Sequence, residues 1–233
     1  MREELDTLII DWSDFEAAGR VTRDLARRLA ADKETLRGLV DAVPHTPALM
    51  QKCERHELLD YLVLYDALDR GFRIRLHAST AVHRERPHDH RFSFSTYIVR
   101  GGYAHTTHLV EAPLYEDAAT DKRSWLSRAS PDPRHDIVSD QIRPLITRCE
   151  QAGDSYSLHH SAVHTTVTTP DTISVFVRGP AEKTDSLIFD RDTGRYWWRF
   201  GAHEEPDERR ESKKMTHDEY EAFRRRMLDL GVI

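Results

Sequence analysis

The chain of 233 residues carries 34 lysines and arginines against 40 aspartates and glutamates, which gives a formal net charge of −6 at pH 7. This mild acidity excludes the basic surface that non-specific nucleic-acid binding requires, so no nucleic-acid partner is predicted. Hydrophobic residues make up 39% of the chain, and no apolar run approaches the roughly 20 residues of a membrane helix. Four Trp, eight Tyr and eight Phe supply a core and exclude disorder of the whole chain.

Histidine is in excess, at fourteen residues, whereas the two cysteines, Cys53 and Cys149, are too few for a disulfide framework. A reduced compartment is the simpler interpretation of that count. The first residues, Met1 to Asp6, are acidic and lack the basic and apolar blocks of a signal peptide. We therefore expect a cytoplasmic protein without a membrane partner, whose chemistry lies where the histidines gather.

The first 60 residues have a helical pattern, which predicts an N-terminal helical extension over 1–60. Ser13 and Glu16 have the spacing of a capping box and predict the start of a helix. Its apolar stripe consists of Phe15, Val21, Leu25 and Leu29. A second helix over 33–43 is expected to end before Pro44, because proline cannot continue a helix.

From residue 61 to about 200 the hydrophobic period becomes that of β-strands. The segments 61–65 and 72–77 predict two strands joined by a turn at 69–71. Further strands are expected at about 89–100, 103–111, 142–149, 155–160, 163–169, 172–178 and 185–198. Gly or Pro marks the breaks between them, and many short strands at this spacing favour an antiparallel sandwich or barrel.

Two stretches do not fit the strand pattern. Residues 113–141 include a polar excursion with Trp125 that is too long for a hairpin, and we expect it to cover the mouth of the cavity. Residues 201–233 begin with a charge run that predicts a solvated linker. Thr216 and Glu219 then form a capping box, which predicts a C-terminal helix packed on the barrel. The three zones are expected to make one compact domain.

Three histidines have the spacing of metal ligands. His88 and His90 are two residues apart at the start of a predicted strand, so their side chains lie on the same face. His164 opens a later strand, after a turn at Gly153 and Asp154. A small barrel can gather such imidazoles around one ion, and neutral imidazoles suit Fe, Zn, Cu or Ni. The sequence therefore predicts a metal site.

This pattern resembles the cupin superfamily. The first cupin motif is matched by His88, His90 and Gly102, and the second by Gly153, Asp154, Tyr156 and His164. The resemblance implies an all-β fold, a cupin (small jelly-roll β-barrel) over 61–200, with helices at both ends. The glutamate ligand of the first motif falls at Ser95, which implies a ligand set of three histidines.

Within the cupins the chain is similar to the cysteine dioxygenase group (thiol dioxygenases), through the tripeptide at 88–90 and the segment 173–194. It departs from that group at the Ser-His-Tyr relay, of which only Ser174 is present. Phe176 and Arg178 occupy the other two relay positions. The carboxylate-binding arginine of the group also has no clean counterpart, so cysteine itself is not expected as the substrate.

Ser95 also stands where that group carries a crosslinking cysteine, so no thioether cofactor is expected. Three histidines leave the double charge of a divalent metal unneutralised, which favours an anionic or chelating substrate. Arg178 adds a charge that can hold a carboxylate if its strand faces inward. His160 and His159 flank the third ligand and are candidates to orient it, and either is an alternative to His164 as the third ligand. The substrate-binding candidates are Arg178, Arg75, Arg73, Tyr97, Tyr103, His105, His108, Phe94, Ser95 and Ser174.

The predicted function is oxidation of a small anionic or amino-acid-like molecule by O2 at an Fe(II) centre, as in a mononuclear non-heme iron dioxygenase. Two alternatives stay open. One is a Zn or Ni cupin enzyme, a hydrolase, isomerase or lyase, and the other is a ligand-binding module without turnover. Because an uncovered edge strand invites pairing, a homodimer is a candidate assembly.

Overall fold

Antiparallel β-sheets form the centre of the structure, a computed structural model that describes residues 1–56, 59–110, 142–190, 195–200 and 205–233. The strands are β1 (Glu54–Arg55), β2 (Leu59–Ala67), β3 (Phe72–Ser79), β4 (His83–Arg84), β5 (Phe94–Arg100), β6 (Gly102–Val110), β7 (Ile142–Gln151), β8 (Ser155–Leu158), β9 (His164–Thr168), β10 (Ile173–Arg178), β11 (Asp185–Asp190) and β12 (Arg195–Phe200). The helices are α1 (Arg2–Thr7), α2 (Phe15–Ala31), α3 (Lys33–Ala42), α4 (Pro47–Met50), α6 (Asp207–Ser212) and α7 (His217–Asp229), with the short 3-10 helices η1 (Val43–His45) and η2 (Leu68–Arg70).

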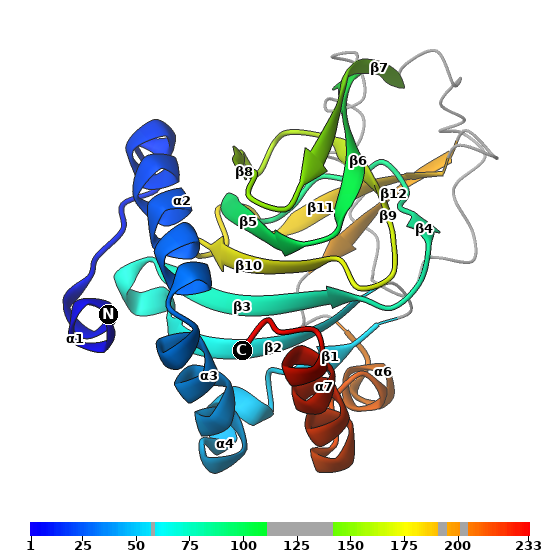
Figure 1. The fold of residues 1–233 in the computed structure, drawn as a ribbon. Coiled ribbons are helices and arrows are strands. Elements are labelled where there is room, and N and C mark those ends of the chain that lie inside the picture. Colours follow the sequence, from blue (N-terminus) through cyan, green and yellow to red (C-terminus); the bar gives the residue numbers. More distant parts are fainter. Residues whose placement is uncertain (57–58, 111–141, 191–194, 201–204) are drawn as a thin grey trace.

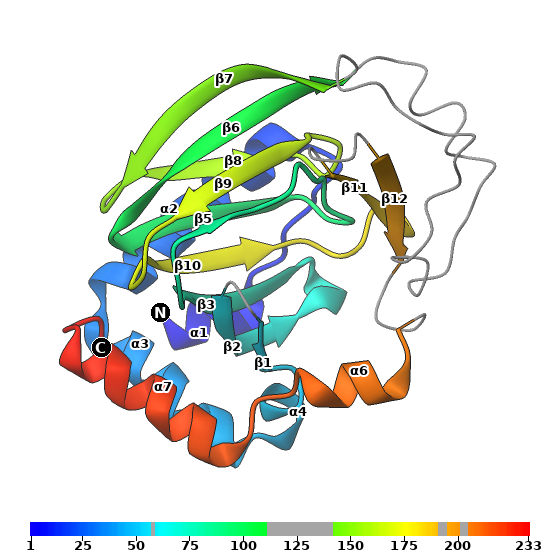
Figure 2. The same ribbon diagram turned by 90° about the vertical axis from the view of Figure 1, so that its right-hand side faces the viewer.

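The strands are arranged as two facing sheets and a hairpin. One sheet has the order β1-β2-β3-β10-β5-β8, the other has the order β4-β9-β6-β7, and β11 pairs with β12. Figures 1 and 2 show the second sheet, with β6 and β7, lying over the first. Antiparallel sheets that face each other in this way form a jelly-roll barrel. The all-β barrel with flanking helices that the sequence predicts is therefore confirmed.

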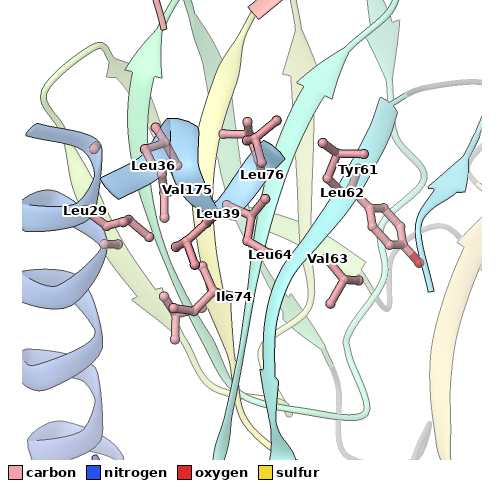
Figure 3. Packing of buried hydrophobic residues seen from close by; sticks show 14 of the residues in the cluster. Leu29, Leu36, Leu39, Tyr61, Leu62, Val63, Leu64, Ile74, Leu76 and Val175 are labelled. Atoms are coloured by element: carbon pink, nitrogen blue, oxygen red, sulfur yellow. The ribbon is translucent and has the colours of Figure 1, made fainter. Parts of the chain in front are cut away.

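Helices cover the outer face of the six-stranded sheet. Figure 2 shows α3, α4 and α7 along this side, away from β6 and β7. Leu29 of α2 and Leu36 of α3 are fully buried against the sheet, where they meet Ile74 of β3 and Val175 of β10 (Figure 3). Because side chains alternate along a strand, the residues between these core positions point to the inside of the barrel. On β3 those inward positions are Arg73, Arg75 and His77.

Several predicted elements are confirmed, with shifted ends. The capping box of Thr216 and Glu219 opens α7 as predicted, and the predicted turn at 69–71 joins β2 to β3. The first long helix is capped by Asp14 and not by Ser13, because the Asp14 carboxylate accepts the hydrogen bond from the N–H of Ala17.

Three other expectations are corrected. The charge run after residue 203 is not all linker, since α6 forms within it. The strand expected at 185–198 is two strands, β11 and β12. The strand expected at 89–100 begins only at Phe94, so His88 and His90 precede it in an irregular segment. No helix among the described residues combines the length and the apolar character needed to cross a bilayer.

The short strand β1 carries a half-buried carboxylate whose ionisation stabilises the fold. Burial raises the pKa of Glu54, but the hydrogen bond to His56 at 2.8 Å and the charge of Lys213 at 3.7 Å outweigh it and lower the pKa to about 2. The Glu54 carboxyl has a pKa of 4.5 when unperturbed, so its contribution is complete above about pH 4.5 and is lost as the pH falls toward 2.

Glu54→Gln is therefore expected to lower the free energy of unfolding by about 2 kcal/mol at pH 7 and by much less at pH 3. Urea denaturation at the two pH values measures the difference. Glu16→Gln is the control, because the Glu16 side chain is 84% exposed and its ion pair contributes little. A loss for Glu54→Gln that is equal at both pH values would contradict the assigned role of its charge.

Candidate metal centre

Three histidine rings meet at one point. The ring centroids of His88, His90 and His164 are 4.7 to 5.0 Å apart, and one nitrogen of each ring lies within 4.8 Å of the other two. The backbone brings them together, because the N–H of His88 donates to the carbonyl of His164 at 2.9 Å and the N–H of His164 donates back at 2.8 Å. This reciprocal pair fixes the HxH segment against the start of β9.

The hydrogen bonds of these rings favour ligation through Nε2. Nδ1 of His88 donates to the carbonyl oxygen of Arg86 at 2.8 Å, which leaves a lone pair on Nε2. Nε2 of His90 and Nε2 of His164 are only 2.8 Å apart, so without an ion one of them must hold a proton between them. Burial is the main cause that lowers the pKa of the His90 and His164 rings well below 6.5, and it favours the neutral form that binds metals.

The donor set fits a divalent transition metal. Neutral imidazoles are good ligands for Fe, Zn, Cu and Ni, and three protein ligands leave further coordination positions for other molecules. The group His88, His90 and His164 can therefore hold one ion, as the sequence predicts.

Asp89, between the first two ligands, anchors the HxH segment. Its carboxylate is 1% exposed and accepts hydrogen bonds from the N–H of Leu187 at 2.7 Å and from the ammonium of Lys183 at 2.5 Å. Burial raises the pKa of Asp89, and the charge of Lys183 opposes that effect. Asp89 was not among the predicted site residues; the strand expected at 89–100 would have pointed its side chain away from the histidines.

His105, on β6, lies against the third ligand. Its Nε2 is 3.0 Å from Nδ1 of His164, and the two ring centroids are 5.0 Å apart. His105 is 1% exposed, so its ring is shielded from solvent behind the ring of His164. His105 is among the substrate-binding candidates of the sequence, and the structure places its ring against the ring of His164.

Aromatic side chains lie on another side of the three histidines. Phe94 is edge-on to the ring of His90, with centroids 4.9 Å apart, and it contacts Phe176 at 4.5 Å. The buried cluster around it consists of Phe94, Tyr156, Leu158 and Phe176, with Phe92, Tyr103 and Ala162 at its edge. This cluster, the aromatic wall, excludes water from one side of the site.

Ser95 and Tyr97 are corrections to the predicted site. The hydroxyl of Ser95 lies 2.6 Å from that of Thr22 on α2 and 2.7 Å from that of Ser157, so it faces the helices. Tyr97 packs on the core that those helices cover. Both residues alternate with Phe94, whose side chain points inward, and therefore lie on the opposite face of β5. Phe94 is the residue of this segment that contacts a ligand ring.

Two other polar candidates bond to neighbouring side chains. The hydroxyl of Tyr103 donates to that of Tyr156 at 2.6 Å, at the edge of the aromatic wall. Nε2 of His108 lies 3.0 Å from Oγ1 of Thr165 on β9. Both thus help to join the strands of the barrel, and their assignment as substrate contacts stays a prediction.

His159 and His160 form a second group with Glu182. One ligand atom of each lies within 4.8 Å of the others, and Nδ1 of His160 is 3.0 Å from Oε2 of Glu182. His160 also accepts the backbone N–H of His90 through its carbonyl at 3.3 Å. The ring of His159 bonds to Ser161. His160 thus contacts His90 through a hydrogen bond of the backbone.

Arg178 faces inward on β10, together with Ser174 and Phe176, because the three alternate on one face of the strand. The residue is 7% exposed, its guanidinium carbon lies 3.8 Å from the ring centroid of Phe92, and its Nε donates to the carbonyl of Gly179 at 2.8 Å. Burial, together with the charges of nearby arginines, lowers the pKa of Arg178 to about 8.

The two arginines of β3 differ in their partners. Arg73 makes a two-bond contact with the carboxylate of Asp66, with both distances 2.9 Å, and Lys52 contacts the same carboxylate. Arg75 lies over the ring of Tyr61 at 4.2 Å, and its buried Nε has no hydrogen bond to the residues that the structure describes. Arg75 and Arg178 therefore bring two positive charges together in the barrel. The excursion 113–141, with Trp125, lies outside the described residues.

No family model matches the chain, and no curated protein matches it. Solved structures match with low scores. A protein of unknown function with a cupin-like fold from Ralstonia eutropha has a TM-score of 0.37 and 12% identity, over 75% of this chain and 76% of its own. An RmlC-like cupin from Shewanella frigidimarina has a TM-score of 0.36 and 15% identity, over 56% of this chain and 85% of its own. KdgF from Halomonas sp. has a TM-score of 0.35 and 12% identity, over 56% of this chain and 88% of its own. Scores this low add no argument about activity.

Proposed function

We propose that the protein is a metal-dependent oxygenase that holds Fe(II) on His88, His90 and His164 and oxidises a small anionic substrate with O2. The observation that carries the proposal is the meeting of three imidazoles at one point, with one nitrogen of each ring within 4.8 Å of the others. When bound, Fe(II) supplies the one-electron chemistry through which O2 reacts with an organic molecule.

The aromatic wall favours oxygenation over hydrolysis. Phe94 contacts the rings of both His90 and His164, with centroids 4.9 and 6.2 Å apart, and Phe176 packs behind it. An apolar surface beside the ligands keeps water away, which disfavours a reaction that consumes water and protects reactive intermediates from it. O2 is itself apolar and is not excluded by such a surface.

The arginines support an anionic substrate. A guanidinium stays protonated in proteins, so lowering the pKa of Arg178 to about 8 reflects a charge buried at a cost in free energy. Arg75 is the first of the neighbouring charges that oppose it, and no carboxylate of the described residues bonds to either guanidinium. A carboxylate or similar anion bound beside them would remove that cost.

The test is oxygen uptake by protein reconstituted anaerobically with Fe(II), measured with a panel of small carboxylic acids, amino acids and thiols. We expect uptake with an anionic member of the panel and none when the same protein is loaded with Zn(II). Iron-loaded protein that binds members of the panel but consumes no O2 would contradict the proposal. Turnover without O2 by the zinc- or nickel-loaded protein would favour the hydrolase, isomerase or lyase alternative instead.

A further inference from the structure

A row of buried polar side chains extends behind the third ligand, from β9 through β6 to β7. His164 and His105 are 3% and 1% exposed, and Nδ1 of the first is 3.0 Å from Nε2 of the second. Nδ1 of His105 then faces Oε1 of Glu150 at 3.6 Å. Arg148, whose side chain is half exposed, lies 3.1 Å from the same oxygen through its Nε.

Because His105 and Glu150 are buried, the hydrogen-bond partners of their polar atoms affect the free energy of the site. Nδ1 of His105 and Oε1 of Glu150 are both buried, and neither makes a hydrogen bond to any residue that the structure describes. A buried polar atom without a partner costs free energy, and the Glu150 carboxylate, which Arg148 also contacts, is the acceptor that Nδ1 of His105 faces. A proton on Nδ1 of His105 gives that nitrogen an acceptor, whereas a lone pair there would face a negative charge.

The position of that proton determines the form of the third ligand. If His105 carries its proton on Nδ1, its Nε2 is an acceptor, and Nδ1 of His164 must donate to it. Nε2 of His164 then has the lone pair that a metal ion needs. With the opposite tautomers, His105 would donate, and His164 would hold its proton on Nε2, where it blocks ligation.

We propose that His105, held by Glu150, is a positioning residue that fixes the tautomer and ring orientation of His164 and so strengthens metal binding. The inference rests on the metal centre of the proposed function. Hydrogen-bond partners of ligand histidines typically change metal affinity by about 10–100-fold, and that is the range expected for this pair.

The experiment measures Co(II) affinity by competition with a chelator, and the visible absorption of the Co(II) protein, for His105→Leu, His105→Gln and Glu150→Gln. His105→Leu removes the acceptor, and we expect affinity to fall about 10–100-fold, with an altered spectrum. His105→Gln keeps a side-chain oxygen that can accept from His164, and it is expected to recover most of the affinity. The Co(II) affinity of Glu150→Gln is expected to lie between that of the wild type and that of His105→Leu.

His77→Leu is the control, because it also removes a histidine that faces the inside of the barrel, one whose ring packs on Phe176 with centroids 4.4 Å apart. We expect its Co(II) affinity to stay within about threefold of the wild type, well inside the range expected for ligand neighbours. Wild-type protein that binds no Co(II) would overturn the metal centre itself. A wild type that binds, with His105→Leu binding equally well or His105→Gln as weak as His105→Leu, would overturn only the positioning role. If His105→Leu does not fold, the two glutamine variants decide.

Discussion

Substitution of His88 by alanine is expected to lower the affinity for Fe(II) by more than about 100-fold and to abolish oxygen uptake. Mutating a residue that only hydrogen-bonds to a ligand typically lowers metal affinity by about 10–100-fold, and losing the ligand itself should cost more. The ring of His88 is partly exposed and bonds to a local carbonyl, so its loss should affect the core little. The measurement is bound iron after anaerobic reconstitution and gel filtration, followed by oxygen uptake of the same sample.

His159→Ala is the control for this result. His159 belongs to the separate group with His160 and Glu182, so its loss should leave iron at His88, His90 and His164 unchanged. Iron binding that survives in His88→Ala but is lost in His159→Ala would mean that the second group is the iron site. That outcome would contradict the proposed centre without affecting the description of the fold.

Replacing Arg178 by methionine is expected to raise the stability of the folded protein while weakening the binding of anions. The guanidinium is buried without a carboxylate partner among the described residues, and an apolar side chain of similar length removes that desolvation cost. The variant loses the contact with Phe92 and the hydrogen bond to Gly179, so we expect a net gain of about 1–2 kcal/mol. Urea denaturation in a buffer without carboxylates, sulfate or phosphate measures it.

The anion completes this test. Added sulfate or a small carboxylate should raise the melting temperature of the wild type, because a ligand of the folded state stabilises it, and should have less effect on Arg178→Met. Arg73→Met is the control, and its free energy of unfolding is expected to change in the opposite direction. It breaks the two-bond contact with Asp66 and should destabilise the protein. If Arg178→Met is destabilised as much as Arg73→Met, Arg178 is structural and is not an anion site.

Local patterns were enough to predict three histidines that the structure brings together and a barrel of antiparallel strands. His88 and His90 are two apart, and His164 opens a strand, so the sequence alone indicates three imidazoles on neighbouring segments. Alternation from His88 and His90 places Phe94 on the side of the histidines, as the structure shows. It places Ser95, another candidate, on the opposite side, and there its hydroxyl meets Thr22 of α2.

The contacts behind the ligands depend on strand register, which the sequence does not reveal. His105 meets His164 because β6 pairs with β9, and Glu150 meets His105 because β7 pairs with β6 on the other side. Which residue of a distant strand lies opposite is decided by bulges and turns across the whole sheet. The same reason explains why Asp89 was not assigned: its partners, Leu187 and Lys183, come from a strand and loop far along the chain.

The most direct test of the metal centre is a crystal structure of the iron-loaded protein, with diffraction data collected on both sides of the iron absorption edge. The predicted result is one anomalous peak, about 2.0–2.2 Å from Nε2 of each of His88, His90 and His164. A peak at His159, His160 and Glu182 instead would contradict the account. So would crystals of the iron-saturated full-length protein in which no anomalous peak lies within bonding distance of the three histidines.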